Sequence, residues 1–263
     1  MASEPAAQAK NRPDIHSRVD GAGPALTLVH GVGARLESWD RVTERLSPRF
    51  RVIRLDLRGH GRSGPIAGAC TLDDFADDVR HVWDRLGVAK THLAGFSLGG
   101  LIAQALALSA PEHIDNLMIL SAVAGRTDEE RAKVAHRLKL VQTEGIAAVV
   151  GAAEERWFTP EFRAAHPDKV ATRLKELQEN DPKSYAAAYT VFATGDLGDR
   201  IHLIRHRTLV ATGENDVGSN VRMARMMHER IAGSTLRILP RLRHSLLVEA
   251  PDAVADLILD FLR

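Results

Sequence analysis

The chain has 263 residues, of which 44% are hydrophobic and 26% are charged, a composition typical of a soluble globular protein. Lys and Arg together number 35 and Asp and Glu 34. This balance gives no reason to expect a nucleic-acid partner or an anionic membrane surface. Cys70 is the only cysteine, which excludes an intrachain disulfide and a cysteine-based metal cluster.

The N-terminal segment is polar and rich in small side chains, without the apolar stretch of a signal peptide. We expect residues 1–14 to form a disordered tail. No apolar run approaches the ~18 residues that a membrane span requires. With no disulfide to favour an oxidising compartment, the sequence predicts a cytoplasmic protein.

Short apolar segments alternate with helical patterns along most of the chain. The predicted strands are Ile15–Val19, Ala25–His30, Arg51–Leu55, Thr91–Gly95, Asn116–Leu120, Thr208–Thr212 and Thr235–Leu239. Apolar residues at three- and four-residue spacing predict helices at Trp39–Leu46, Thr71–Leu86, Leu98–Ser109, Val221–Ile231 and Asp252–Leu262. Such alternation predicts a mostly parallel sheet with helices on both faces.

Residues 125–200 interrupt this alternation. They contain helical patterns at Asp128–Glu144, Ile146–Arg156, Lys169–Glu179 and Lys183–Phe192, and no convincing strand. We therefore predict an α/β core at residues 15–124 and 201–263, with a helical cap of residues 125–200 inserted between two strands of the sheet.

The segment Leu93–Gly100 reads L-A-G-F-S-L-G-G and places Ser97 between Gly95 and Gly99. A G-x-S-x-G sequence between a strand and a helix is typical of a nucleophile elbow, in which a serine occupies a strained turn. The N–H of Leu98, at the start of the helix, is placed to stabilise an oxyanion. Taken alone, the segment is also compatible with a glycine-containing turn that has no chemical role.

A reactive serine needs a base, and the base needs a group that orients it. His244 lies in a short loop after the strand at Thr235–Leu239, and Asp216 follows the strand at Thr208–Thr212. Ser97, Asp216 and His244 stand in the chain order that enzymes with such an elbow use. Glu214 is the rival acid, and its position in the loop makes it the weaker candidate.

The segment His30-Gly31-Val32-Gly33 follows the strand at Ala25–His30. Its glycines allow the N–H of Val32 to face Ser97 as a second oxyanion donor. We interpret His30 as a structural hydrogen-bonding residue. The segment Asp56–Ser63 is predicted to be a structural turn, without a catalytic role for His60.

These motifs together resemble the α/β-hydrolase superfamily. They are H-G-V-G, D-L-R-G-H-G-R-S, G-F-S-L-G-G, G-E-N-D and R-H-S-L-L-V-E-A-P, in this order along the chain. Within the superfamily, the segments E-R-W-F-T-P-E-F (Glu155–Phe162) and Y-A-A-A-Y (Tyr185–Tyr189) are most similar to the 3-oxoadipate enol-lactonase and carboxylesterase group. The resemblance implies an α/β-hydrolase fold with a helical cap before the strand that carries the catalytic acid. It also implies hydrolysis of a small-molecule ester or lactone through an acyl-enzyme on Ser97, with no metal and no cofactor.

The predicted cap is expected to select the substrate. The candidate pocket walls are Trp39, Phe96, Trp157, Phe158, Tyr189 and Leu246, although aromatic residues of a helical cap often only pack its own core. Arg126 and Arg35 lie on loops near the predicted mouth and are candidates for binding a substrate carboxylate.

Several alternatives stay open at this point. Enzymes that cleave carbon–carbon bonds or amides share the same motifs. A ligand receptor with little turnover and a cofactor-free oxygenase also use this scaffold, since a fold alone does not determine a function. A homodimer is compatible with the sequence.

Overall fold

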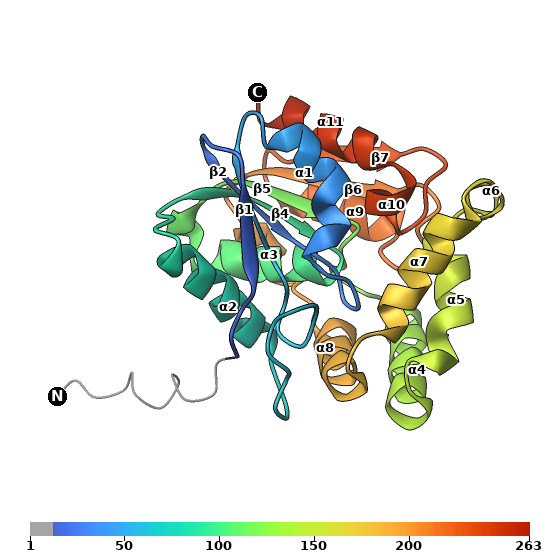
Figure 1. The fold of residues 1–263 in the computed structure, drawn as a ribbon. Helices are drawn as coiled ribbons and strands as arrows, with labels where there is room; N and C mark the ends of the chain where they lie inside the picture. Colours follow the sequence, from blue (N-terminus) through green and yellow to red (C-terminus); the bar gives the residue numbers. More distant parts are fainter. Residues whose placement is uncertain (1–12) are drawn as a thin grey trace.

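A seven-stranded sheet runs through the middle of the molecule (Figure 1), in the order β1-β3-β2-β4-β5-β6-β7. The computed structural model describes residues 13–263, so the predicted tail lies outside the described residues except for its last two. The strands are β1 (Ser17–Asp20), β2 (Ala25–Val29), β3 (Arg51–Leu55), β4 (Thr91–Phe96), β5 (Ile114–Leu120), β6 (Arg207–Gly213) and β7 (Thr235–Leu239). β1 pairs antiparallel with β3, and the other pairings are parallel. The predicted mostly parallel sheet is confirmed.

Helices cover both faces of this sheet. One apolar cluster packs the sheet against α2 (Leu72–Arg85), α3 (Leu98–Ser109) and α9 (Val221–Arg230). A second cluster packs the opposite face against α1 (Asp40–Leu46) and α11 (Pro251–Phe261). Short helices complete the core at η2 (Leu36–Trp39), η3 (Pro111–His113), η4 (Ile201–Leu203) and α10 (Leu246–Glu249).

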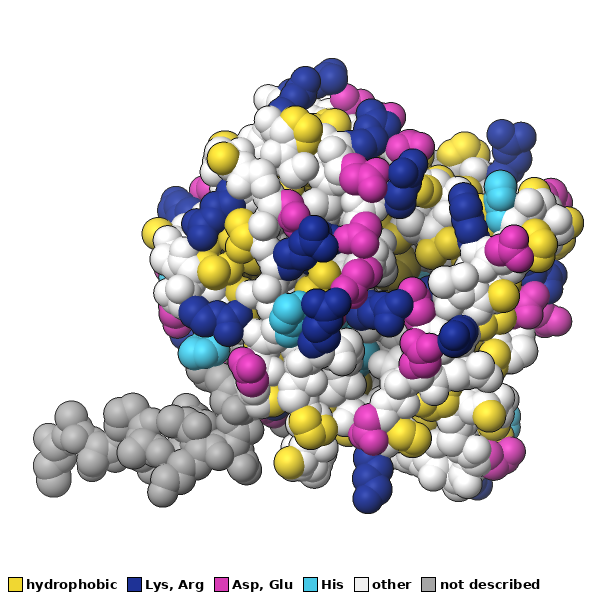
Figure 2. Space-filling view, viewed as in Figure 1, with side chains coloured by type: hydrophobic (Ala, Val, Ile, Leu, Met, Phe, Trp, Pro, Cys, Tyr) yellow, Lys and Arg dark blue, Asp and Glu magenta, His cyan; other side chains and the backbone are white. Residues whose placement is uncertain are grey.

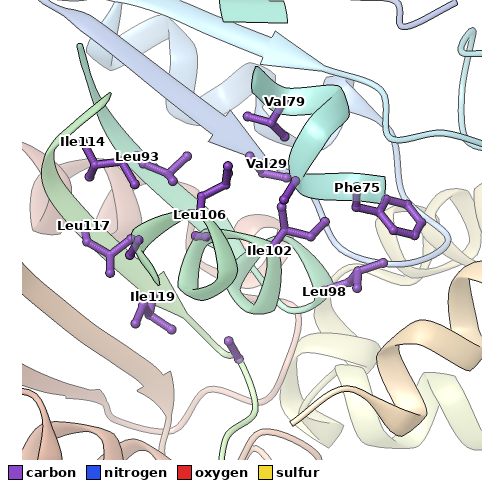
Figure 3. Close-up of a cluster of buried hydrophobic side chains, with 14 of the residues drawn as sticks. Val29, Phe75, Val79, Leu93, Leu98, Ile102, Leu106, Ile114, Leu117 and Ile119 are labelled. Carbon is purple, nitrogen blue, oxygen red and sulfur yellow. The ribbon is translucent and has the colours of Figure 1, made fainter. Parts of the chain in front are cut away.

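Adjacent residues of the central strands belong to opposite faces. In β5, Leu117 and Ile119 join the cluster on the α3 side, while Met118 and Leu120 join the cluster on the α1 side. Figure 3 shows Leu117 and Ile119 beside Ile102 and Leu106 of α3. Because both faces are buried, the strands read as continuous apolar runs instead of alternating patterns.

Five α-helices lie between β5 and β6 and gather at one side of the sheet (Figure 1). They are α4 (Asp128–Glu144), α5 (Ala147–Trp157), α6 (Pro160–Ala165), α7 (Pro167–Gln178) and α8 (Pro182–Thr194). The sequence patterns predict four of them. The patterns do not predict α6, because six residues are too few for a periodic pattern. The local signals of a helix start are nevertheless present, since the Thr159 side chain caps α6 and Pro160 occupies its first turn.

Asp196 holds the two ends of this helical insertion together. Its carboxylate accepts hydrogen bonds from the N–H of Gly125 (2.6 Å) and the N–H of Arg126 (2.8 Å) at the beginning of the insertion. It also accepts one from Gly198 N–H (2.9 Å) at the end. The insertion therefore leaves and re-enters the core at one point.

The charged side chains are mixed on the surface. On the face shown in Figure 2, basic and acidic residues are interspersed. Within residues 13–263, no helix is both long enough and apolar enough to cross a membrane.

Candidate active site

Ser97 occupies the junction between β4 and α3 in a backbone conformation that is unfavourable for a non-glycine residue, with φ +56°. A Cβ atom on Gly95 would lie 2.0 Å from the carbonyl oxygen of Gly99. A Cβ on Gly99 would lie 2.2 Å from the carbonyl oxygen of Val29. The two glycines are therefore required because backbone surrounds the serine on both sides.

The structure brings Ser97, His244 and Asp216 together. His244 Nε2 lies 3.1 Å from Ser97 Oγ, and His244 Nδ1 lies 2.7 Å from Asp216 Oδ2. A carboxylate only accepts hydrogen bonds, so Nδ1 carries the proton and Nε2 is left to accept one from the serine hydroxyl.

Asp216 is held from its other side by the backbone. Its Oδ1 accepts hydrogen bonds from the N–H groups of Gly218 (2.8 Å) and Ser219 (2.9 Å). Burial alone would raise the pKa of Asp216, but the charge of His244 and the hydrogen bonds to this carboxylate outweigh it and lower the pKa. Asp216 is therefore ionised at neutral pH.

Glu214 does not contact the histidine. Its side chain is exposed and accepts a hydrogen bond from the N–H of Arg241 at 2.9 Å. The structure thus places Asp216, and not the rival acid, beside His244.

Two backbone N–H groups are available near Ser97. Within residues 13–263, neither the N–H of Val32 nor that of Leu98 has a hydrogen-bond partner. Leu98 is the first residue of α3, where helical N–H groups lack partners and the helix dipole favours negative charge. The loop of Val32 approaches closely, because a Cβ on Gly31 would lie 2.9 Å from Ser97 Cβ.

Two buried histidines hold this loop in place. His30 Nε2 accepts a hydrogen bond from the N–H of Leu57 (3.0 Å), and His60 Nε2 accepts one from the N–H of Gly33 (3.0 Å). Asp56 supports the same region by accepting from the N–H of Leu36 (2.8 Å). Their contacts agree with the structural roles predicted for these residues.

Both histidines are expected to make the fold sensitive to acid. Burial lowers the pKa of His30 to about 4 and that of His60 to about 3, whereas an unfolded histidine titrates near 6.5. Below that value the unfolded chain binds more protons than the folded one, so stability falls as the pH falls. When the pH falls from 6.5 to 5, we expect each of these two histidines to lower the free energy of unfolding by about 2 kcal/mol.

Chemical denaturation at pH 7, 6 and 5 measures this loss. His136→Gln is the matched control, because it removes a histidine that is exposed on α4 instead of one that is buried. An unfolding free energy that stays constant from pH 7 to pH 5 would contradict the prediction.

A cavity lies above Ser97, between the core loops and the inserted helices. Of the predicted substrate-binding residues, Phe96, Arg126, Trp157 and Tyr189 line it, together with Ser97, Asp216 and His244. Further walls come from Val134 of α4, Val149 and Ala153 of α5, Tyr185 and Phe192 of α8, and Leu247 and Val248 of α10.

Three predicted pocket walls need correction, because none of them lines this cavity. Trp39 and Leu246 are fully buried in the apolar cluster on the α1 side of the sheet. Phe158 is also fully buried, and its ring stacks on Phe162 with the ring centres 5.7 Å apart. All three are therefore buried residues that do not line the cavity.

The two arginines proposed for a substrate carboxylate are already occupied. Arg126 donates to the carbonyl groups of Phe192 (2.9 Å) and Gly195 (2.7 Å), at the C-terminal end of α8. Arg35 lies outside the cavity and forms ion pairs with Glu176 (3.2 Å) and other surface acids. Arg126 thus binds the C-terminal end of α8, and Arg35 takes part in ion pairs at the protein surface.

The sequence patterns missed three other arginines that line the cavity, namely Arg137, Arg156 and Arg173. The available signal was helical spacing. Arg137 lies seven residues after Glu130, and Arg156 lies seven residues after Val149, so each follows the cavity-facing side of its helix. Within residues 13–263, no three His, Cys, Asp or Glu side chains are grouped so that they could hold a metal ion.

Comparison with known proteins places this geometry in a family. The family model described as alpha/beta hydrolase fold matches residues 24–251. The chain is 31% identical to the (E)-2-((N-methylformamido)methylene)succinate hydrolase of Acinetobacter baylyi over 251 residues, which are 94% of this chain and 93% of that protein. It is also 31% identical to 3-oxoadipate enol-lactonase 2 of the same organism over 230 residues, 88% of this chain and 85% of that protein.

A solved structure agrees with these matches. The enol-lactonase from Burkholderia xenovorans superimposes with a TM-score of 0.90 at 28% identity, covering 96% of this chain and 97% of that one. The resemblance predicted from the five motifs is confirmed by these comparisons. From its matched family model and its relatives, the chain belongs to the α/β-hydrolase fold family and is a hydrolase.

Proposed function

We propose that this protein is a serine hydrolase that cleaves an ester or lactone carbonyl through an acyl-enzyme on Ser97. The observation that carries the proposal is the hydrogen-bonded chain Ser97 Oγ–His244 Nε2–Asp216, with distances of 3.1 and 2.7 Å. A serine with this arrangement is activated for attack on a carbonyl carbon.

The residues have separate roles in the proposed reaction. His244 accepts the Ser97 proton through Nε2 while the serine oxygen attacks, and it then donates the proton to the leaving oxygen. Asp216 keeps the proton of the imidazole on Nδ1 and stabilises its charged form. The N–H groups of Val32 and Leu98 hold the negative oxygen of the tetrahedral intermediate. Water, activated by the same histidine, then releases the acid.

The inserted helices are proposed to act as a cap. Residues of α4, α5, α7 and α8 line the same cavity as Ser97, so they surround any molecule that reaches the serine. The Trp157 carbonyl, at the end of α5, accepts a hydrogen bond from the N–H of Ser245 at 3.0 Å. This contact joins the cap directly to the loop of His244.

An ester or lactone is supported by the enol-lactonases among the similar proteins. Two relatives and one structural neighbour are named as enol-lactonases, and the neighbour superimposes over nearly its full length. Amides and ring-fission diketones are the alternatives that the test below distinguishes.

A fluorophosphonate probe tests the covalent step, because it reacts with activated serines. We expect one probe per chain, on the peptide that contains Ser97, and none after Ser97→Ala. Hydrolysis is then measured on enol-lactones, short-chain esters, amides and ring-fission diketones, with turnover of the first two classes expected. Probe labelling without turnover of any compound would favour a receptor, and turnover of only amides or diketones would change the proposed bond.

A further inference from the structure

Both chain neighbours of His244 are hydrogen-bonded to the inserted helices. On one side, the N–H of Ser245 donates to the carbonyl oxygen of Trp157 at 3.0 Å. On the other side, the guanidinium group of Arg243 donates to the carbonyl oxygen of Glu155, two residues before the Trp157 carbonyl. The backbone that carries the histidine is therefore attached to the end of α5 through the residue before it and through the residue after it.

Glu249, the last residue of α10, makes a third link between the same two segments. Its Oε1 accepts hydrogen bonds from the N–H (2.8 Å) and from the hydroxyl (3.0 Å) of Thr159, which lies between α5 and α6. Its Oε2 accepts a hydrogen bond from the N–H of Arg243 at 2.9 Å. One carboxylate thus joins the insertion to the residue that directly precedes His244.

The Glu249 link lies outside the substrate cavity. Leu247 and Val248 of α10 line the cavity above Ser97, but Glu249 does not. Thr159 is buried and does not line the cavity either. Any effect of Glu249 on the reaction is therefore transmitted through the backbone that it holds, and not through contact with a substrate.

The surroundings of Glu249 require a group that only accepts hydrogen bonds. Three donors point at its two oxygens, and a carboxylate meets them because it carries no donor of its own. A glutamine has the same size but one oxygen and one NH₂ group. Whichever way its amide turns, the N–H of Thr159 or the N–H of Arg243 then faces a second donor. Glu249→Gln therefore breaks one side of the link without removing the side chain.

Resting on the proposed reaction at Ser97, we propose that Glu249 is a positioning residue, which keeps His244 in place by fixing Arg243 to the cap. His244 Nε2 lies 3.1 Å from Ser97 Oγ, and proton transfer depends on this distance. A displacement of about 1 Å in a catalytic group can reduce the rate about 100-fold. The cap then has a second task besides surrounding the substrate, because its Thr159 end supports the catalytic histidine.

Glu249→Gln tests this role by kinetics on the best ester or lactone. We expect kcat, counted per serine that the fluorophosphonate probe labels, to fall about 10- to 100-fold. KM is expected to change less than about 3-fold, because the cavity walls are kept. The rate constant of probe labelling is expected to fall by a similar factor to kcat, since the probe also needs the base. Glu161→Gln is the matched control, because it removes the same charge from an exposed position of α6.

Two variants of Thr159 test the link from its other end, and they decide the question if Glu249→Gln does not fold. Thr159→Ser keeps the hydroxyl and is expected to retain kcat within about 2-fold. Thr159→Val keeps the shape and the N–H but loses the hydroxyl bond to Glu249, so kcat per labelled serine is expected to fall about 5- to 20-fold. The same hydroxyl caps α6, so a lower melting temperature of Thr159→Val is also expected.

Proton NMR reads the placement of His244 without any turnover. The proton between His244 Nδ1 and Asp216 Oδ2, which are 2.7 Å apart, is expected to give a low-field resonance in the wild type. His244→Gln assigns the resonance by removing it. We expect the resonance to broaden or to disappear in Glu249→Gln, because a loosened imidazole exchanges this proton with water, and to stay unchanged in Glu161→Gln.

The proposal is overturned if Glu249→Gln keeps kcat per labelled serine within about 3-fold of the wild type, if KM changes in place of kcat, or if the low-field resonance is unchanged. Equal values of kcat per labelled serine in Thr159→Ser and Thr159→Val would overturn it as well. A lower melting temperature with unchanged kcat per labelled serine would show that Glu249 has only a structural role.

Failure of the proposed reaction has a different signature. In that case the probe would not label Ser97 of the wild type. The low-field resonance would still show whether Glu249 holds His244 beside Asp216, because that measurement needs neither the probe nor a substrate.

Discussion

Ser97→Ala is expected to reduce kcat by about 10⁴- to 10⁶-fold while leaving the fold intact. The change removes only the Oγ atom, which His244 Nε2 contacts at 3.1 Å. The unusual backbone of residue 97, with φ +56°, is retained because the Cβ atom remains. The residual rate then comes from substrate binding and from the N–H groups of Val32 and Leu98.

Steady-state kinetics on the best ester or lactone, together with a thermal unfolding curve, measure this loss. Ser109→Ala is the matched control, because Ser109 is the last residue of the same helix and its hydroxyl donates to the carbonyl of Ala105 at 2.9 Å. A Ser97→Ala protein with more than one tenth of the wild-type kcat would show that the serine is not the nucleophile.

Asp216→Asn is expected to reduce kcat by roughly 10⁴-fold, with little change in the fold. Because Oδ1 accepts from the N–H groups of Gly218 and Ser219, the asparagine oxygen is expected to occupy that side. The amide NH₂ then faces His244 Nδ1, which has to accept a hydrogen bond. The imidazole proton moves to Nε2, and this nitrogen can then no longer accept the proton of Ser97.

Glu214→Gln is the control for this variant, since the two acids are separated by one residue in the same loop. Glu214 accepts a hydrogen bond from the backbone N–H of Arg241, and a glutamine oxygen can accept the same bond. We expect Glu214→Gln to retain kcat within about 3-fold. Equal losses in the two variants, measured on the same substrate, would show that the loop as a whole and not the Asp216 carboxylate is required.

Local signals were sufficient for most secondary structure and for the turn that carries Ser97. The helix α4 begins and ends where its periodicity predicts, and α2 begins one residue after the predicted start at Thr71, whose side chain accepts a hydrogen bond from the N–H of Asp74. The glycines around Ser97 indicate the elbow because the clashes that they avoid arise within a few residues of the chain or with the adjacent strand. A short sequence segment is therefore enough to predict such a feature.

Contacts between distant segments decided the rest of the site. Trp39, Leu246 and Phe158 have the composition of pocket walls, but burial against other elements makes them core residues. Arg126 has the charge of a carboxylate ligand, but the end of α8, more than sixty residues later, takes its donors. A residue type shows what a side chain is able to bind, and only its neighbours show which of its groups are already bound.

The sequence by itself therefore determined the fold class, the order Ser97, Asp216, His244, and the membership in a family of hydrolases. Only the tertiary structure decided that Asp216 and not Glu214 meets the histidine, and that the donors of Arg126 are occupied by the end of α8. The physical reason is that each donor or acceptor forms a limited number of hydrogen bonds and ion pairs, so a group that is already bonded is not available to a substrate. Which polar groups remain available for a substrate depends on all long-range contacts at once, and no local pattern encodes them.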